Sequence, residues 1–159
     1  LLEAEDVMAV LRNDPLAPQD LKKKAIYMAG VLLNMTGKYS KWQGALKAKE
    51  ILESGKALAK MNEIIRMQGK QKRPSLGEYR YLLKSGKAGI IKEIDNEIIA
   101  KIARVAGAPR DKGSGLFLNK KVHQKVKRGE PLYTIYAESK FKLDLSLEIM
   151  RKNNGYLIK

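Results

Sequence analysis

The segment AGAPRDKGSGLFLNKKVHQKVKRGEPLYTIYAE, residues 106–138, decides the fold of this chain of 159 residues. It joins two glycine-containing loops to two short apolar runs, residues 116–118 and 132–137, which have the length and composition of strands. Between the runs, Gly129 can take a positive φ, and Pro131 can begin a strand because no amide donor is needed there. These features predict a unit of short strands in the second half of the chain.

The residues around this segment predict two helices and two further strands. Residues 88–94 have the pattern of a strand, and Asp95 after them is a good N-cap for a helix that ends at Gly107. Residues 139–154 are expected to form the last helix, and residues 156–158 a closing strand. The second half therefore mixes helices with short strands.

The first half of the chain is expected to be helical. Apolar residues recur there at helical spacing, and glycine or proline separates the runs. Helices are expected over residues 1–11, 18–36, 41–53 and 57–68. In the second helix, the spacing predicts a buried face made of Leu21, Ala25, Met28, Ala29, Leu32 and Leu33. In the third helix, Trp42, Ala45, Leu46, Lys49 and Leu52 stand at the same helical spacing.

A polar stretch divides the two halves. Residues 68–77, QGKQKRPSLG, contain glycine, proline and several cations, which is typical of a linker. We therefore predict two parts, residues 1–73 and residues 74–159. Limited trypsin digestion should cut first between Lys70 and Arg73.

The net charge of +15 raises the question of a polyanionic partner. The excess is spread along the chain, since residues 1–73 hold 14 basic and 8 acidic residues and residues 74–159 hold 18 and 9. The 24 Lys outnumber the 8 Arg, although Arg is the better bidentate partner for phosphates and bases. We therefore expect a solvated surface and no nucleic-acid partner. Any polyanion contact is expected at the densest cluster, Lys120, Lys121, Lys125, Lys127 and Arg128.

Composition sets further limits on function. The absence of Cys excludes a disulfide framework, a thiol nucleophile and a Cys-based metal site. No apolar run approaches the roughly 18 residues that a membrane helix needs, so no membrane partner is expected. The first residues, LLEAEDVMAV, are acidic and amphipathic, unlike a signal peptide, and they begin without Met inside a predicted helix. We therefore expect a cytoplasmic protein and a chain that is a fragment of a longer one.

Motifs for phosphate, cofactor or metal binding are missing. No G-x-x-x-x-G-K-[ST] occurs, and the glycines at 113 and 115 are not followed by the third glycine of G-x-G-x-x-G. His123 is the single histidine, and its polar surroundings indicate a solvated loop position. Asp95 and Glu97 fit a helix cap and first turn better than a catalytic carboxylate pair.

Several segments carry a family resemblance. IDNEIIAKIAR, AGAPRDKGSG and GEPLYTIYAE follow one another within residues 93–148, and GVLLNMTGK, ALKAKEILESGKA and MNEIIRMQG follow one another within residues 30–69. In this order and spacing the chain resembles the thymidine/AMP phosphorylase family, the pyrimidine nucleoside phosphorylases. The words AGAP and TIYAE are closer to those of archaeal AMP phosphorylases, and abundant Lys, Glu and Ile without Cys is typical of a thermophile.

The resemblance implies an α+β fold: a helical segment from the large α/β domain of the family, residues 1–73, followed by its small C-terminal hammerhead-like module, residues 74–159. It also implies an enzyme of nucleotide salvage that uses inorganic phosphate, and no cofactor or metal, to cleave AMP into adenine and ribose 1,5-bisphosphate. AMP or a nucleoside and phosphate would bind through the missing N-terminal part of a homo-oligomer. The family's phosphate and base motifs have no counterpart here, so we assign no catalytic residue and expect this chain alone to be inactive.

One loop is a candidate substrate contact. In relatives of the family, the segment that matches residues 107–115 lies near the mouth of the cleft. Here it carries Arg110 and Lys112, two cations between glycines that permit movement and can approach an anionic nucleotide. The alternative is a surface turn that only ends a helix.

Three other functions remain open from the sequence. The chain can belong to a thymidine or pyrimidine nucleoside phosphorylase. It can be a stand-alone adaptor, because G-E-P-L turns also occur in lipoyl and biotinyl carriers, although no modifiable Lys beside Met stands at a hairpin tip here. It can also be a basic nucleic-acid-binding module, which only the net charge supports.

Overall fold

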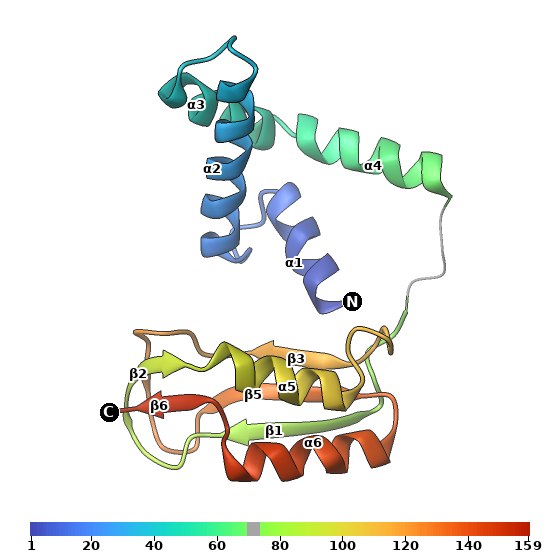
Figure 1. Ribbon diagram of the computed structural model, residues 1–159, viewed down its shortest axis with the longest axis vertical. Coiled ribbons are helices and arrows are strands. Elements are labelled where there is room, and N and C mark those ends of the chain that lie inside the picture. Colours follow the sequence, from blue (N-terminus) through green and yellow to red (C-terminus); the bar gives the residue numbers. More distant parts are fainter. Residues whose placement is uncertain (70–73) are drawn as a thin grey trace. The chain divides into compact units, whose positions relative to one another are not determined.

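The computed structural model describes residues 1–69 and 74–159 (Figure 1). These residues divide into two compact units: a helical unit over residues 3–69, and an α+β unit over residues 74–159 together with Leu1 and Leu2. The predicted trypsin site between Lys70 and Arg73 lies outside the described residues. The domain boundary at residue 73 remains a prediction. So does the assignment of the two parts to the large domain and the C-terminal module of the family.

Four helices make up the described part of the helical unit. They are α1 (Leu2–Leu11), α2 (Gln19–Met35), α3 (Lys41–Glu53) and α4 (Lys56–Gln68). Local capping explains why α3 begins where it does: the Ser40 hydroxyl accepts from the Gln43 amide, and the Gln43 side chain accepts from the Ser40 amide at 2.9 Å. Gly55, with φ of 78°, separates α3 from α4. These bounds lie within a few residues of those expected from the sequence.

Two glycines allow α2 and α3 to pack closely. A Cβ atom placed on Gly30 would lie 2.8 Å from the Ala45 Cα atom, and one placed on Gly44 would collide with the Gly30 carbonyl oxygen. Only hydrogen at these two positions leaves room for the other backbone. Gly30 is the buried residue of α2, and Gly44, Ala48 and Leu52 are those of α3.

The predicted buried face of α2 is therefore largely wrong. Met28 and Leu32 are 54% and 64% exposed, Ala25 and Ala29 are exposed too, and Leu21 and Leu33 are only partly buried. In α3, Trp42 and Leu46 are likewise exposed. Helical spacing marks where an apolar stripe lies, but α3 covers α2 along the glycine contact instead. Part of the apolar surface of α2 and α3 is therefore exposed.

The α+β unit has eight elements. They are β1 (Tyr79–Lys84), β2 (Gly89–Ile94), α5 (Asn96–Ala106), β3 (Gly115–Leu118), β4 (Lys125–Val126), β5 (Pro131–Ala137), α6 (Lys140–Lys152) and β6 (Tyr156–Ile158). The strands form two antiparallel sheets, in the orders β1-β5-β3 and β4-β2-β6. This arrangement confirms the α+β class. The two short strands β1 and β4 were not expected from the sequence.

One apolar core holds the α+β unit together. Helices α5 and α6 contact each other and both contact β5. Ile102 of α5 and Tyr133 and Ile135 of β5 have no exposed surface. The Asp95 carboxylate accepts from the amides of Glu97 and Ile98 at 3.0 and 3.1 Å, which confirms the predicted cap of α5. This core fixes the loops from which every candidate functional residue projects.

Candidate functional site

The loop of residues 107–115 is built from two tight turns. Gly107, with φ of 123°, ends α5 as expected. The Asp111 amide donates to the Gly107 carbonyl at 2.9 Å, and the Ser114 amide donates to the Asp111 carbonyl at 3.1 Å. These turns bring the loop back on itself before β3 begins at Gly115.

An ion pair ties this loop to α6. The Lys142 ammonium lies 2.5 Å from the Asp111 carboxylate, whose side chain is only 15% exposed. A Cβ atom on Gly107 would collide with the same carboxylate. Asp111 therefore has a structural role and leaves the neighbouring cations to face solvent.

A second set of bonds holds the end of the loop. The Gly113 amide donates to the Glu138 carboxylate at 2.7 Å, and its carbonyl accepts from the Gly77 amide at 2.9 Å. The Glu138 amide donates in turn to the Ser114 hydroxyl at 3.2 Å. A Cβ atom on Gly113 would collide with the Ser75 carbonyl oxygen. Gly113 thus allows the backbone of residues 75–77 to approach the loop closely. From the sequence, this glycine was instead expected to permit movement.

The two candidate substrate-binding side chains point to no protein partner. Arg110 and Lys112 are both exposed, and across residues 1–69 and 74–159 neither side chain has a hydrogen bond or ion pair. Their role in substrate binding remains a prediction.

The other sequence candidates have ordinary structural roles. His123 is exposed with φ of 69°, and its amide donates to the Ile91 carbonyl at 2.8 Å, so it is a turn residue as expected. Asp95 and Glu97 belong to the start of α5. In the part of the chain that the structure describes, no group of three or more His, Asp or Glu residues is placed to hold a metal ion. No helix there is both long and apolar enough to cross a membrane.

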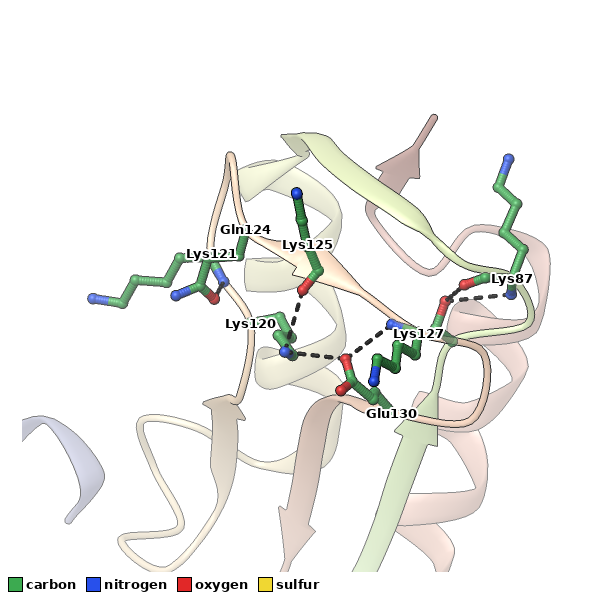
Figure 2. A network of polar contacts seen from close by, with 8 residues as sticks. Lys87, Lys120, Lys121, Gln124, Lys125, Lys127 and Glu130 are labelled. Carbon is green, nitrogen blue, oxygen red and sulfur yellow. Dashed lines mark hydrogen bonds and ion pairs between the residues drawn. The ribbon is translucent and has the colours of Figure 1, made fainter.

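A basic surface is the second site that the fold assembles. We define it by six exposed or partly exposed cations of neighbouring turns, drawn in part in Figure 2: Lys87, Lys120, Lys121, Lys125, Lys127 and Arg128. Five of them come from the cluster seen in the sequence. Lys87 was missed because it lies far away in the sequence, in the turn between β1 and β2, and no local pattern links it to the cluster.

Backbone hydrogen bonds bring Lys87 to this surface. The Ser85 amide donates to the Glu130 carbonyl, and the Gly129 amide donates to the Ser85 carbonyl, both at 2.8 Å. The buried Ser85 hydroxyl donates to the Lys87 carbonyl at 2.6 Å. The turn before β2 and the turn before β5 are therefore fixed against each other.

Glu130 organises the centre of the basic surface. Its carboxylate accepts from the Lys127 amide at 2.9 Å and lies 3.1 Å from the Lys120 ammonium (Figure 2). The Lys120 ammonium also donates to the Lys125 carbonyl at 3.3 Å. The hydrogen bond from the Lys127 amide, followed by Lys120, lowers the pKa of the Glu130 carboxyl, so it is charged at neutral pH.

Tyr156 supports this surface from the core, and Tyr133 lies beside it. The Tyr156 hydroxyl donates to the Lys120 carbonyl at 2.7 Å, and the Tyr133 hydroxyl donates to the Asn154 carbonyl at 3.1 Å. The two rings lie 5.6 Å apart between centroids. Burial raises the pKa of Tyr156 to about 12 and raises that of Tyr133 further. Both therefore stay protonated at neutral pH and act as structural hydrogen-bond donors.

Comparison with known proteins finds a family match in the second half of the chain. Residues 90–157 match the family described as the pyrimidine nucleoside phosphorylase C-terminal domain. This range begins in β2 and ends in β6, so it includes the loop of residues 107–115 and every cation of the basic surface except Lys87. Most of the α+β unit is therefore similar to this C-terminal domain.

Particular relatives match almost the whole chain. Proteins named "Putative thymidine phosphorylase" are 43% identical in Rhodopseudomonas palustris (strain BisA53), 42% in Methylococcus capsulatus (strain Bath) and 39% in Legionella pneumophila (strain Corby). Each match covers 99% of this chain. The chain spans only 31%, 31% and 30% of the lengths of these bacterial proteins.

Proposed function

We propose that this chain is the C-terminal third of a nucleoside phosphorylase, a pentosyltransferase. Such an enzyme cleaves an N-glycosidic bond with inorganic phosphate and releases a free base and a sugar 1-phosphate. The observation that carries the proposal is the C-terminal domain match over residues 90–157, within relatives about three times as long as the chain. The helical unit then belongs to the large α/β domain of the whole enzyme.

The apolar surface of the helical unit supports this assignment. Met35, Trp42 and Met67 are 75%, 73% and 80% exposed. A hollow in this unit has an almost wholly apolar lining drawn from α1, α2, α3 and the first turn of α4. Exposed apolar surface of this extent usually marks a place where another part of a protein packs. In the whole enzyme, the rest of the large domain would cover it.

AMP is the first candidate substrate, with adenine and ribose 1,5-bisphosphate as products of a salvage reaction. The choice of AMP rests on the sequence segments AGAP, residues 106–109, and TIYAE, residues 134–138. Thymidine or another pyrimidine nucleoside is the second candidate, and the names of the bacterial relatives favour it. An archaeal or thermophilic origin gains no support from these relatives.

The chemistry assigns a limited task to the described residues. Phosphorolysis requires phosphate, sugar and base to be held in line, so catalysis is mainly positioning and charge stabilisation. Most of the groups that do this would lie in the rest of the enzyme, a cytoplasmic homo-oligomer that needs no cofactor. Arg110 and Lys112 are the candidates within this chain, because two solvated cations at the tip of a fixed loop can contact a substrate phosphate.

The test is a phosphorolysis assay on the whole enzyme and on this chain. AMP and thymidine are incubated separately with inorganic phosphate, and released adenine or thymine is quantified. The whole enzyme should release one base only when phosphate is present, and this chain alone should release none. Phosphate-independent release, or no release from a panel of nucleosides and nucleotides, would overturn the proposal. Turnover by this chain alone would show that it carries a complete active site.

A further inference from the structure

The basic surface has a charge imbalance that the fold increases. Residues 119–130 contain five cations and a single carboxylate, Glu130. The hydrogen bonds between the two turns add Lys87 to one side of this cluster. Like charges placed close together repel one another, so such a cluster contributes nothing to folding by itself.

Glu130 cannot neutralise the outer cations. Its carboxylate is occupied by the Lys127 amide and the Lys120 ammonium. Lys87, Lys125, Lys127 and Arg128 are exposed, and within the described ranges their side chains form no ion pair. Figure 2 shows that the Lys87 side chain, from the turn before β2, and the Lys125 side chain, from β4, both point away from Glu130. Four exposed positive groups therefore lie on β4 and on two turns that backbone hydrogen bonds join.

The side chains around these groups define the partner's chemistry. A stable protein interface needs a buried core of aromatic or large apolar residues, and the only large apolar residue exposed in the turn is Val122. Reading of bases relies on bidentate side chains, whereas three of the four outward groups are Lys. A phosphate backbone requires only closely spaced positive charges. The observations thus favour a chain of phosphates over a protein surface.

We propose that the basic surface binds the phosphate backbone of an extended polyanion, independently of its sequence. The ligand chemistry is a row of phosphate groups, as in RNA, DNA or inorganic polyphosphate. A shallow hollow beside the cations can accommodate the phosphate backbone. It is lined by Gly89, Ile90, Lys125, Val126, Lys127 and Glu130. From the sequence, no nucleic-acid partner was expected, because the positive charge is spread along the chain. In the fold, however, Lys87 lies with the cations of residues 120–128, which supports this proposal. This inference does not depend on the proposed phosphorolysis.

The test compares two variants of equal charge. The surface variant carries Lys87→Gln, Lys125→Gln, Lys127→Gln and Arg128→Gln. The control variant carries Lys101→Gln, Lys140→Gln, Arg151→Gln and Lys152→Gln, which are exposed positions of α5 and α6. Each variant loses four positive charges from the same unit. Far-UV circular dichroism checks that both remain folded.

Binding of fluorescent single-stranded oligo-U and oligo-A is measured by anisotropy at several salt concentrations. The native chain and the control variant should bind both oligomers alike. The surface variant should bind more than tenfold more weakly, and its plot of log affinity against log salt should be shallower by about 3, from about 0.7 per lost contact on a single strand. Unlabelled polyphosphate and duplex DNA as competitors distinguish the sources of the phosphate chain.

Each contrary outcome decides against the inference. Equal weakening of the two variants would mean that net charge alone causes binding. Strong preference for one base would mean that recognition does not rest on phosphates. Absence of binding at low salt, or binding only to vesicles containing phosphatidylserine, would remove the polyphosphate partner. If the surface variant unfolds, the single variants Lys87→Gln and Lys125→Gln replace it, and each should lower the salt slope by about 0.7.

Discussion

The helical unit and the α+β unit bury their apolar residues to very different extents. Among the described residues, the core cluster of the α+β unit contains twelve buried side chains, whereas that of the helical unit contains three, Val10, Ala17 and Leu52. Both units have apolar residues at helical spacing. The contrast teaches that an amphipathic pattern shows where a helix can be covered, while coverage depends on what other chain is present to pack there.

The largest expected effect tests this contrast directly. Ile135→Ala removes a side chain with no exposed surface from β5 and should cost about 2–5 kcal/mol of unfolding free energy. Met35→Ala at the end of α2, where Met35 is 75% exposed, should change the unfolding free energy by less than about 0.5 kcal/mol. Urea unfolding followed by circular dichroism measures both. Equal losses would show that the helical unit is packed as tightly as the α+β unit.

The next prediction concerns the one close contact of the helical unit. Gly44→Ala places a Cβ atom against the Gly30 carbonyl oxygen and should push α2 and α3 apart, at a cost of about 1–3 kcal/mol. This loss should exceed the helix-propensity gain of up to about 1 kcal/mol that alanine brings. Fluorescence of Trp42, the single tryptophan, on α3, reports the unfolding.

Gly86→Ala is the matched control for this substitution. An added Cβ atom at Gly86 has no neighbour within 4 Å, and its stability effect should stay within about 0.5 kcal/mol. If Gly44→Ala proves as stable as the native chain, the two glycines are not what fixes the distance between α2 and α3.

Local signals explain how much of the fold the sequence predicts. Asp95 caps α5, Gly107 ends it and Pro131 begins β5 because each acts through its own backbone and close neighbours. The bounds of α3 follow in the same way from Ser40 and Gly55. Such residues predict where elements begin and end, whereas the α+β fold was implied by the family resemblance.

Contacts between distant residues explain what the sequence does not predict. Strand β1 depends on pairing with β5, where Tyr81 faces Ile135, and its own residues carry no clear strand pattern. The close approach of Gly30 to Gly44 and the hydrogen bond between Gly129 and Ser85, in the turn that carries Lys87, likewise depend on partners far along the chain. Among the candidate site residues, Arg110 and Lys112 were found from sequence only through family resemblance, and nothing in the described structure tests their role.

Alkaline pH should affect the α+β unit through its buried tyrosines. An unfolded tyrosine ionises at about pH 10, whereas burial raises the pKa of Tyr156 to about 12. The stabilisation from protonated Tyr156 is complete below about pH 10 and is lost as pH rises towards 12. Tyr156→Phe should reduce the fall in stability between these pH values, although it removes the hydrogen bond to the Lys120 carbonyl.

Urea unfolding at several alkaline pH values, followed by circular dichroism, measures this fall. Tyr27→Phe, at an exposed position of α2, is the control and should leave the pH dependence unchanged. Tyr133 should account for the dependence that remains in Tyr156→Phe, because burial raises its pKa as well. An identical pH dependence in the native chain and Tyr156→Phe would show that Tyr156 ionises equally easily in both states.

The smallest effect on stability is expected at the tip of the loop of residues 107–115. Arg110 and Lys112 are exposed and form no side-chain bond in the described parts of the chain, so replacing both by Ala should change the unfolding free energy by less than about 0.5 kcal/mol. Asp111→Asn, between them, should cost more, about 1 kcal/mol, because it removes the partner of Lys142. In this loop, Asp111 therefore stabilises the fold, whereas Arg110 and Lys112 do not and are available to bind a ligand.

Kinetics of the whole enzyme would show whether Arg110 and Lys112 contact the substrate. If Arg110 or Lys112 contacts the phosphate of AMP, losing a charged hydrogen bond of about 1.5–3 kcal/mol should raise KM for AMP roughly 10- to 150-fold. KM for the unphosphorylated nucleoside should change much less, since it lacks the group that the cations bind. Arg151→Ala with Lys152→Ala, exposed cations at the end of α6, is the control for lost charge. Unchanged kinetics for both substrates would show that the loop only ends α5. Its bonds to Lys142 and Glu138 would then be its whole contribution, and that contribution is to folding.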